Sequence, residues 1–188
     1  AARLADHVRA QENVQRVNAV LNNSTLRGNT YDALQAEVTL LDGVIFWQQG
    51  NAPAARPRME QALELARRTD DHTLQARVLS FLGTVYREAS ELSRAYDCFV
   101  EQLNLSRAHA DSRREWAALN NLGLIETARG NFEQALANYN DALRIVRDIG
   151  DRLGEGALLN NFAAAAMEHG AYDQAHAYAS RAVIVTKG

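Results

Sequence analysis

The sequence contains little proline and almost no cysteine. Its 188 residues include two prolines, Pro53 and Pro57, and one cysteine, Cys98. Because proline interrupts helices, its scarcity favours a helical chain, and a hydrophobic fraction of 47% argues against disorder. A single cysteine cannot form an internal disulfide, which suits a reducing compartment. We therefore expect a cytoplasmic protein in which Cys98 is a small buried side chain.

Long apolar runs and an excess of charge of one sign are also missing. No run reaches the roughly 20 residues that a membrane-spanning helix requires, and no signal peptide is visible. The formal net charge is −3, which predicts no general affinity for nucleic acid or for anionic membranes. The chain begins Ala1-Ala2-Arg3 without methionine, so we expect a processed chain or an excised fragment.

Motifs that would support catalysis or metal binding are absent from the sequence. No histidine pair has the spacing of a metal site; the histidines are His7, His72, His109, His169 and His176. The glycines recur at turns and packing positions and form no phosphate-binding loop. Asp70 and Asp71 lie in a predicted connection between helices, where helix capping is the expected role. We predict no enzymatic activity, no cofactor and no metal.

A repeat of 40 residues is the dominant feature that the sequence does contain. Glycines recur at Gly43, Gly83 and Gly123, and Ala163 occupies the next position. The same spacing relates Ala55, Ala95, Ala135 and Ala175, and also Gly50, Ser90, Gly130 and Gly170. A period of this size is typical of a solenoid, in which each repeat contacts its neighbours.

The hydrophobic spacing predicts a pair of helices in each repeat. Residues 3–21 form an amphipathic helix with Leu4, Val8, Val14, Val17 and Leu21 on one side, followed by a loop over 22–30; together they are an N-terminal cap or half-repeat. Four repeats follow at 31–70, 71–110, 111–150 and 151–188, with helices near 31–49, 52–68, 73–89, 92–108 and 172–187 among them. The resulting fold class is all-α.

Several residues either support this pattern or depart from it. Asp71, Asp111 and Asp151 begin the first helix of their repeats, where a carboxylate can cap free amides. Asp42 occupies a position that is apolar in the other repeats, so we expect it to face the preceding loop or the helix to be rotated. Pro57 should kink or delay its helix.

Within each unit the residues resemble one known repeat type. Leu119, Leu122 and Gly123 are followed by Ala135, Tyr139 and Ala142; Leu79, Leu82 and Gly83 are followed by Tyr86, Ala95 and Phe99. This pattern resembles the tetratricopeptide repeat (TPR) over residues 31–188. The period of 40 exceeds the usual value of about 34, and Arg67, Arg107 and Arg147 replace the usual closing proline. It is similar to the long-helix TPRs of kinesin light chains, Pins-type adaptors and bacterial signalling regulators.

The resemblance implies a right-handed α-solenoid whose first helices line a concave peptide-binding groove. Helical spacing places Ala117, Asn121, Leu124 and Ala128 on one face. The ligand-binding residues that it implies are Leu41, Val44 and Trp47 in repeat one, Arg77, Phe81, Thr84 and Arg87 in repeat two, and Asn121, Leu124 and Asn161 in repeats three and four.

Asn121 and Asn161 are the preferred candidates in this groove, because a carboxamide offers a donor and an acceptor to a peptide backbone. Their alternative role is hydrogen bonding within the chain, and Asn120 and Asn160 could face the groove in their place. Leu41 and Phe81 should make the first half of the groove apolar. With Arg77 and Arg87 as the available cations, we expect an internal peptide segment rather than a terminal carboxylate.

The predicted function is therefore a scaffold that binds a peptide or protein segment. The alternative is a sensor or regulatory region of a larger bacterial signalling or transcription-regulating protein. The last helix ends in Val183, Ile184 and Val185 with no polar helix after it. Since a terminal repeat normally shields its outer face, we expect the native chain to continue or helix 172–187 to mediate self-association.

Overall fold

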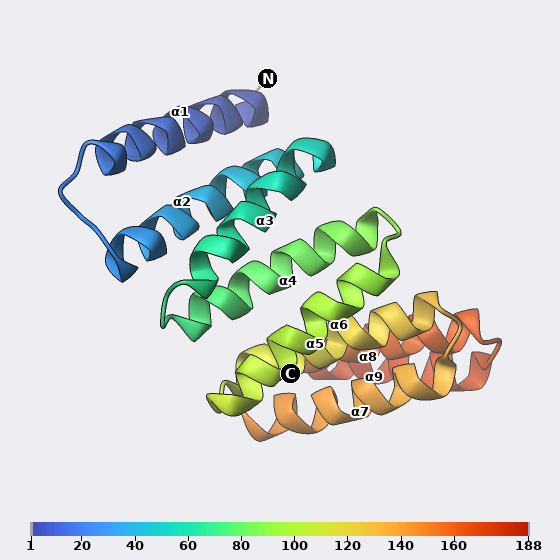
Figure 1. Cartoon of the computed structure of the whole chain (residues 1–188). Coiled ribbons are helices and arrows are strands. Elements are labelled where there is room, and N and C mark those ends of the chain that lie inside the picture. Colours follow the sequence, from blue (N-terminus) through green and yellow to red (C-terminus); the bar gives the residue numbers. More distant parts are fainter. Residues whose placement is uncertain (1, 188) are drawn as a thin grey trace. The chain divides into compact units, whose positions relative to one another are not determined.

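A computed structural model describes the backbone of residues 2–187 and the side chains of residues 9–186 (Figure 1). All regular structure in this part is α-helical: α1 (Ala2–Asn22), α2 (Asn29–Gln48), α3 (Ala52–Arg67), α4 (His72–Glu88), α5 (Leu92–Ala108), α6 (Ser112–Ala128), α7 (Phe132–Asp148), α8 (Arg152–Glu168) and α9 (Tyr172–Lys187). The all-α class is confirmed. None of the described helices combines the length and apolarity needed to cross a membrane.

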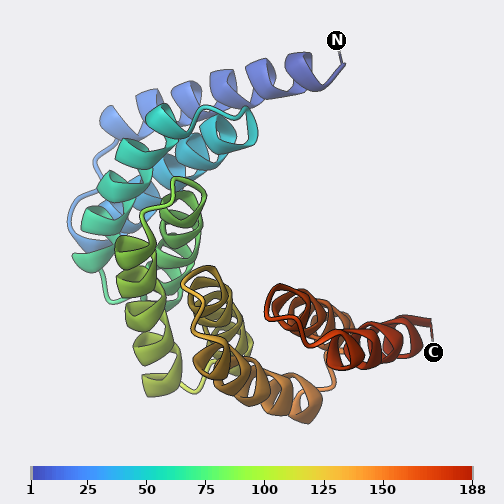
Figure 2. The same cartoon turned by 90° about the vertical axis from the view of Figure 1, so that its right-hand side faces the viewer.

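The chain divides into two compact units, Ala1–Cys98 and Phe99–Gly188, with the boundary inside α5. In the first unit, α2 and α3 form a hairpin, α1 packs against α2, and α4 packs against α3 and α2 (Figure 1). In the second unit, α6 and α7 form one hairpin and α8 and α9 another, which Figure 2 shows side by side in red. The division into a cap and four repeats stays a prediction.

The helix α1 is held by a small apolar core. Val14 and Leu21 of α1 pack with Val38 and Ile45 of α2. Val17, predicted on the same side, is instead 45% exposed. Viewed along the helix axis, Val17 is about 60° away from Val14 and about 40° away from Leu21. Leu4 and Val8 lie outside the described side chains.

Asp42 is the clearest departure from the repeat pattern, and the structure explains it by pairing. Its Oδ2 atom accepts a hydrogen bond from Arg58 Nε at 2.9 Å across the α2–α3 hairpin. At the equivalent position of the last repeat, Phe162 stacks on Tyr178 with 4.6 Å between ring centroids. An ion pair thus replaces an apolar contact, and neither of the two predicted explanations is needed.

Proline and aspartate mark the helix starts. Pro53 lies in the first turn of α3, but the prediction that Pro57 would delay the helix is wrong, because α3 begins at Ala52. Asn51 caps it through a bond from Ala54 N at 3.2 Å. The predicted aspartate caps are confirmed in α4, α6 and α8: Asp71, Asp111 and Asp151 accept hydrogen bonds from Leu74 N, Arg114 N and Gly154 N at 2.8, 3.0 and 2.9 Å.

Buried aromatic side chains join the helices of each unit. In the first unit, Tyr86 of α4 donates to Glu60 Oε1 of α3 at 2.5 Å, and the Arg94 guanidinium lies 4.4 Å above its ring. Burial, followed by the bond to Glu60, raises the pKa of the Tyr86 hydroxyl. In the second unit, Tyr139 of α7 packs against Gly123 of α6, where any Cβ would clash with the ring. The first contact thus joins α4 to the α2–α3 hairpin, and the second joins the two helices of the α6–α7 hairpin.

Candidate functional site

In the first unit, α2 and α4 enclose a cavity of about 270 Å³. Its described lining consists of Glu37, Leu40, Leu41, Val44, Arg77 and Phe81. The four residues of α2 have the spacing of one helix face, and Arg77 and Phe81 are one turn apart on α4. Leu41 is 54% exposed although it is a large apolar residue. The structure thus brings together Leu41, Val44, Arg77 and Phe81 from the predicted set.

Polar links lie at both ends of this apolar cavity. At one end, Arg77 donates to Glu37 Oε1 at 2.6 Å. At the other, Trp47 Nε1 donates to Glu88 Oε2 at 2.6 Å, and the Trp47 ring meets Phe81 edge-on with centroids 6.2 Å apart. Both links join α2 to α4, so the walls of the cavity are held at a fixed spacing.

One hydrogen-bond donor of the Arg77 side chain is not used within the described part of the chain. Its Nε atom is buried and has no hydrogen-bond partner among the described residues. A buried donor left unpaired costs about 1–3 kcal/mol. A carbonyl oxygen brought by a ligand would remove that cost.

Two predicted residues of repeat two are not in the cavity lining. The Thr84 hydroxyl donates to the Ser80 carbonyl oxygen one turn earlier in α4, at 2.9 Å. Arg87 is half-buried near the end of α4 and does not line the cavity. Leu40, which was not predicted, does line the cavity although it is only 3% exposed.

In the second unit, the predicted asparagines are arranged differently from the expectation. Asn161 Nδ2 of α8 donates to Asn120 Oδ1 of α6 at 2.6 Å. The bond therefore joins Asn161 to the neighbour of Asn121, and Asn160 is exposed. Asn121 and Leu124 are half-buried on α6. For Asn161 this is the alternative role, a hydrogen bond within the chain, and a ligand would have to share or displace it.

A smaller cavity of about 230 Å³ lies at the ends of α6 and α8 and the start of α7. Ala128, which lies on the predicted face of α6, and Glu168 of α8 are part of its lining. Phe132 and His169 stack beside it with ring planes 8° apart and centroids at 4.0 Å. This stack could not be predicted from spacing, because the two residues are 37 positions apart and do not share a helix.

The described residues contain no group of three or more histidine, cysteine, aspartate or glutamate side chains that could hold a metal ion. The acidic residues near the α2–α4 cavity, Glu37 and Glu88, are each hydrogen bonded to a side chain of the opposite helix.

A family model described as tetratricopeptide repeat matches residues 36–108 and 116–183. The match begins in α2 and includes both the α2–α4 cavity and the α6–α8 contact. No curated protein sequence matches the chain.

Several solved structures resemble the chain. BtubC (BKLC) from P. vanneervenii superposes with a TM-score of 0.86 at 16% identity, over 98% of this chain and 75% of that one. Aspartyl phosphate phosphatase F from Bacillus subtilis gives 0.76 at 14%, over 86% and 42%. The Rap conjugation gene regulator of the plasmid pLS20, in complex with the Phr* peptide, gives 0.72 at 17%, over 82% and 43%. These likenesses show the helical-repeat fold alone, and the chain spans less than half of the last two proteins.

Proposed function

Since the chain belongs to the tetratricopeptide repeat family, we propose that it is a scaffold that binds a peptide or a segment of another protein on the face of its first helices. The observation that carries this proposal is the apolar cavity between α2 and α4. Support also comes from the pLS20 regulator, a protein of similar fold that was solved in complex with a peptide.

The size and chemistry of the cavity suit side chains of a peptide. At about 270 Å³ it lies just below the roughly 300–1,000 Å³ of typical small-molecule sites. Leu41, Val44 and Phe81 offer an apolar surface, and burying one leucine-sized side chain there is worth about 1.5–3 kcal/mol. Arg77 Nε, which has no partner within the described part of the chain, would donate to a main-chain carbonyl oxygen of the same peptide.

The second unit offers candidates of its own for contact with a peptide. They are Asn121 and Leu124. Asn161 remains one only if its bond to Asn120 is shared with the ligand. A carboxamide that already donates one hydrogen bond keeps further donor and acceptor capacity. Each additional bond would contribute about 0.5–1.5 kcal/mol.

The proposal assigns the chain no reaction of its own and locates the scaffold in the cytoplasm. One of the proteins of similar fold is named a phosphatase, so a regulatory region of a larger signalling protein is the alternative function. It predicts that the protein in cells contains an effector domain besides these repeats, whereas the scaffold proposal requires none.

A defined peptide provides the test. Phage-displayed random peptides are selected on the purified chain, and the strongest binder is synthesised and titrated by calorimetry. Leu41→Asn keeps the size of the side chain but removes its apolar surface, so we expect the affinity to fall about 10–30-fold. Leu153→Asn is the matched control, because Leu153 is 78% exposed and lies outside the cavity. Equal affinity of wild type and Leu41→Asn would overturn the proposal.

A further inference from the structure

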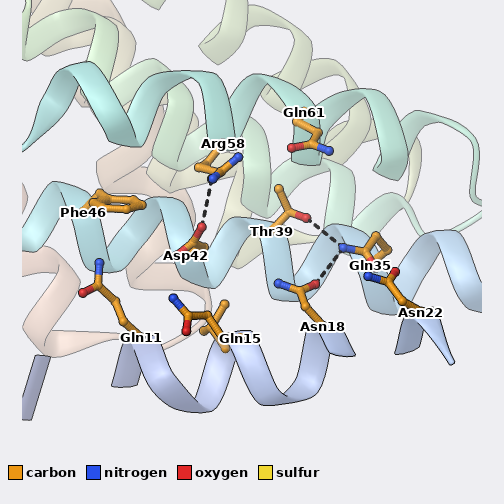
Figure 3. A pocket seen from close by; sticks show the side chains of 11 residues that line it. Gln11, Gln15, Asn18, Asn22, Gln35, Thr39, Asp42, Phe46, Arg58 and Gln61 are labelled. Carbon is orange, nitrogen blue, oxygen red and sulfur yellow. Dashed lines mark hydrogen bonds and ion pairs between the residues drawn. The ribbon is translucent and has the colours of Figure 1, made fainter. Parts of the chain in front are cut away.

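A second cavity, of about 390 Å³, lies between α1, α2 and α3 (Figure 3). Eleven of the described side chains line it. Most of them are carboxamides: Gln11, Gln15, Asn18, Asn22, Gln35 and Gln61. We call this cavity the amide groove. Among the described residues it shares no lining residue with the α2–α4 cavity.

Helical spacing explains why the carboxamides gather there. On α1, Gln11, Gln15, Asn18 and Asn22 recur once per turn, next to the face that carries Val14 and Leu21 into the core. On α2, Gln35, Thr39, Asp42 and Phe46 recur in the same way. Each row spans 12 residues, which corresponds to about 16 Å of helix axis between the first and the last. The two rows face each other in Figure 3, so the groove is elongated.

One carboxamide in the groove is incompletely satisfied. Gln35 Nε2 donates to Asn18 Oδ1 at 2.8 Å and lies 3.5 Å from Thr39 Oγ1. Its carbonyl atom, Oε1, is buried and has no hydrogen-bond partner in the described part of the chain. A buried acceptor without a donor is unfavourable, so the groove calls for a ligand that brings N–H or O–H groups.

The charge of the groove restricts the ligand further. Its charged lining residues, among those described, are Asp42 and Arg58, which are paired at 2.9 Å and neutralise each other. Carboxamides both donate and accept hydrogen bonds, as does each peptide unit of a main chain. A length of about 16 Å accommodates about five residues of extended peptide at roughly 3.3 Å each.

From these features we propose that the amide groove binds an uncharged, extended peptide segment of about five residues by hydrogen bonding to its main chain. The carboxamides of α1 and the Gln35 carbonyl pair with the peptide units. Phe46 offers an apolar contact to one side chain. This site is separate from the α2–α4 cavity and does not depend on it.

Nuclear magnetic resonance with defined probes can test the groove. The full chain is labelled with ¹⁵N, and its side-chain NH₂ signals are followed during titration with capped pentapeptides composed of Ala, Ser, Thr, Asn and Gln. We expect saturable shifts of the Asn18 and Gln35 signals, and at least tenfold weaker binding when the central residue is Asp or Lys. Maltose is a further probe, because its hydroxyl groups could also pair with carboxamides.

Two exposed groove residues provide variants that should leave the fold intact. Gln15→Ala and Gln61→Ala, made together, should weaken binding of the pentapeptides at least tenfold, with an unchanged circular dichroism spectrum. Gln134→Ala, an exposed glutamine of α7, is the matched control and should bind like wild type. The proposal is overturned if the pentapeptides give no saturable shifts, if maltose shifts these signals at lower concentration than they do, or if the double variant binds as wild type does.

Discussion

Replacing Gly123 by alanine should destabilise the second unit, because there is no room for a methyl group between α6 and α7. A Cβ atom at this position would lie 2.3 Å from Cε1 and 2.6 Å from Cδ1 of Tyr139. Carbon atoms in contact normally lie about 3.5–4.0 Å apart. The Tyr139 ring or the α6–α7 spacing would therefore have to shift by about 1 Å.

Moving the Tyr139 ring would cost free energy, because it is packed on several sides. It is completely buried, its centroid lies 5.2 Å from that of Phe162, and its hydroxyl lies 3.2 Å from Thr127 Oγ1. Overpacking of this kind costs about 1–3 kcal/mol, whereas alanine regains about 0.8–1.0 kcal/mol of helix propensity over glycine. With so short a contact we take the upper part of the range and expect a net loss of about 1–2 kcal/mol.

Urea unfolding followed by circular dichroism measures this loss, and Gly156→Ala is the control. The Cβ of that variant would meet Thr186 Cγ2 at 2.5 Å, but Thr186 is an exposed side chain in the last turn of α9 and can rotate. We expect Gly156→Ala to be neutral or stabilising by up to about 1 kcal/mol. The reasoning fails if Gly123→Ala unfolds at the wild-type urea concentration, or if both variants lose the same stability.

Two further predictions concern the joint between α5 and α6. Burial tends to raise the pKa of Asp111, but hydrogen bonds from the main chain and guanidinium of Arg114 lower it below its ordinary value of 3.8. The carboxylate therefore contributes stability that is present above pH 3.8 and is lost as the pH falls through the lowered pKa. Asp111→Asn can still cap the helix, so its stability against urea should depend less steeply on pH in that acid range. An unchanged slope would contradict this prediction. Ala110 has a φ of 52° where Gly150 has 69° in the next repeat, so Ala110→Gly should stabilise the chain by up to about 1 kcal/mol in the same assay, and a loss of stability would refute it.

The repeat made most helices predictable from the sequence. The helices predicted at 92–108 and 172–187 agree with α5 and α9, and the aspartate caps were placed correctly. These features depend on residues close in sequence. The same local pattern occurs again every 40 residues, which strengthens each prediction. Helical spacing also places Leu41 and Val44 together on α2, and both line the α2–α4 cavity.

The remaining features depend on contacts that spacing cannot specify. The partner of Asp42 is a single arginine on the next helix, and Asn161 donates to Asn120, 41 positions away. The amide groove was missed although the spacing of Gln11, Gln15, Asn18 and Asn22 was visible, because a polar helix face is ordinarily solvated. The packing of both α1 and α3 against α2 turns that face into the wall of a cavity.

The joints that precede α6 and α8 are copies of each other. Asp111 N donates to Ser106 O at 2.8 Å and Asp151 N to Val146 O at 2.9 Å. Arg107 pairs with Glu115 at 2.9 Å, and Arg147 with Glu155 at 2.6 Å. Each of these four bonds connects residues no more than eight positions apart.

When a segment of 40 residues that begins at one joint and ends at the next is added or removed, the bonds of a joint can therefore form again where the chain is rejoined. Duplication or deletion of residues 111–150 would recreate the same bonds, whereas insertion of one residue at 109 or 149 would separate the partners of several bonds at once. The protein can thus be lengthened or shortened by whole repeats without any new contacts at the joint. The same change can be engineered to add binding surface.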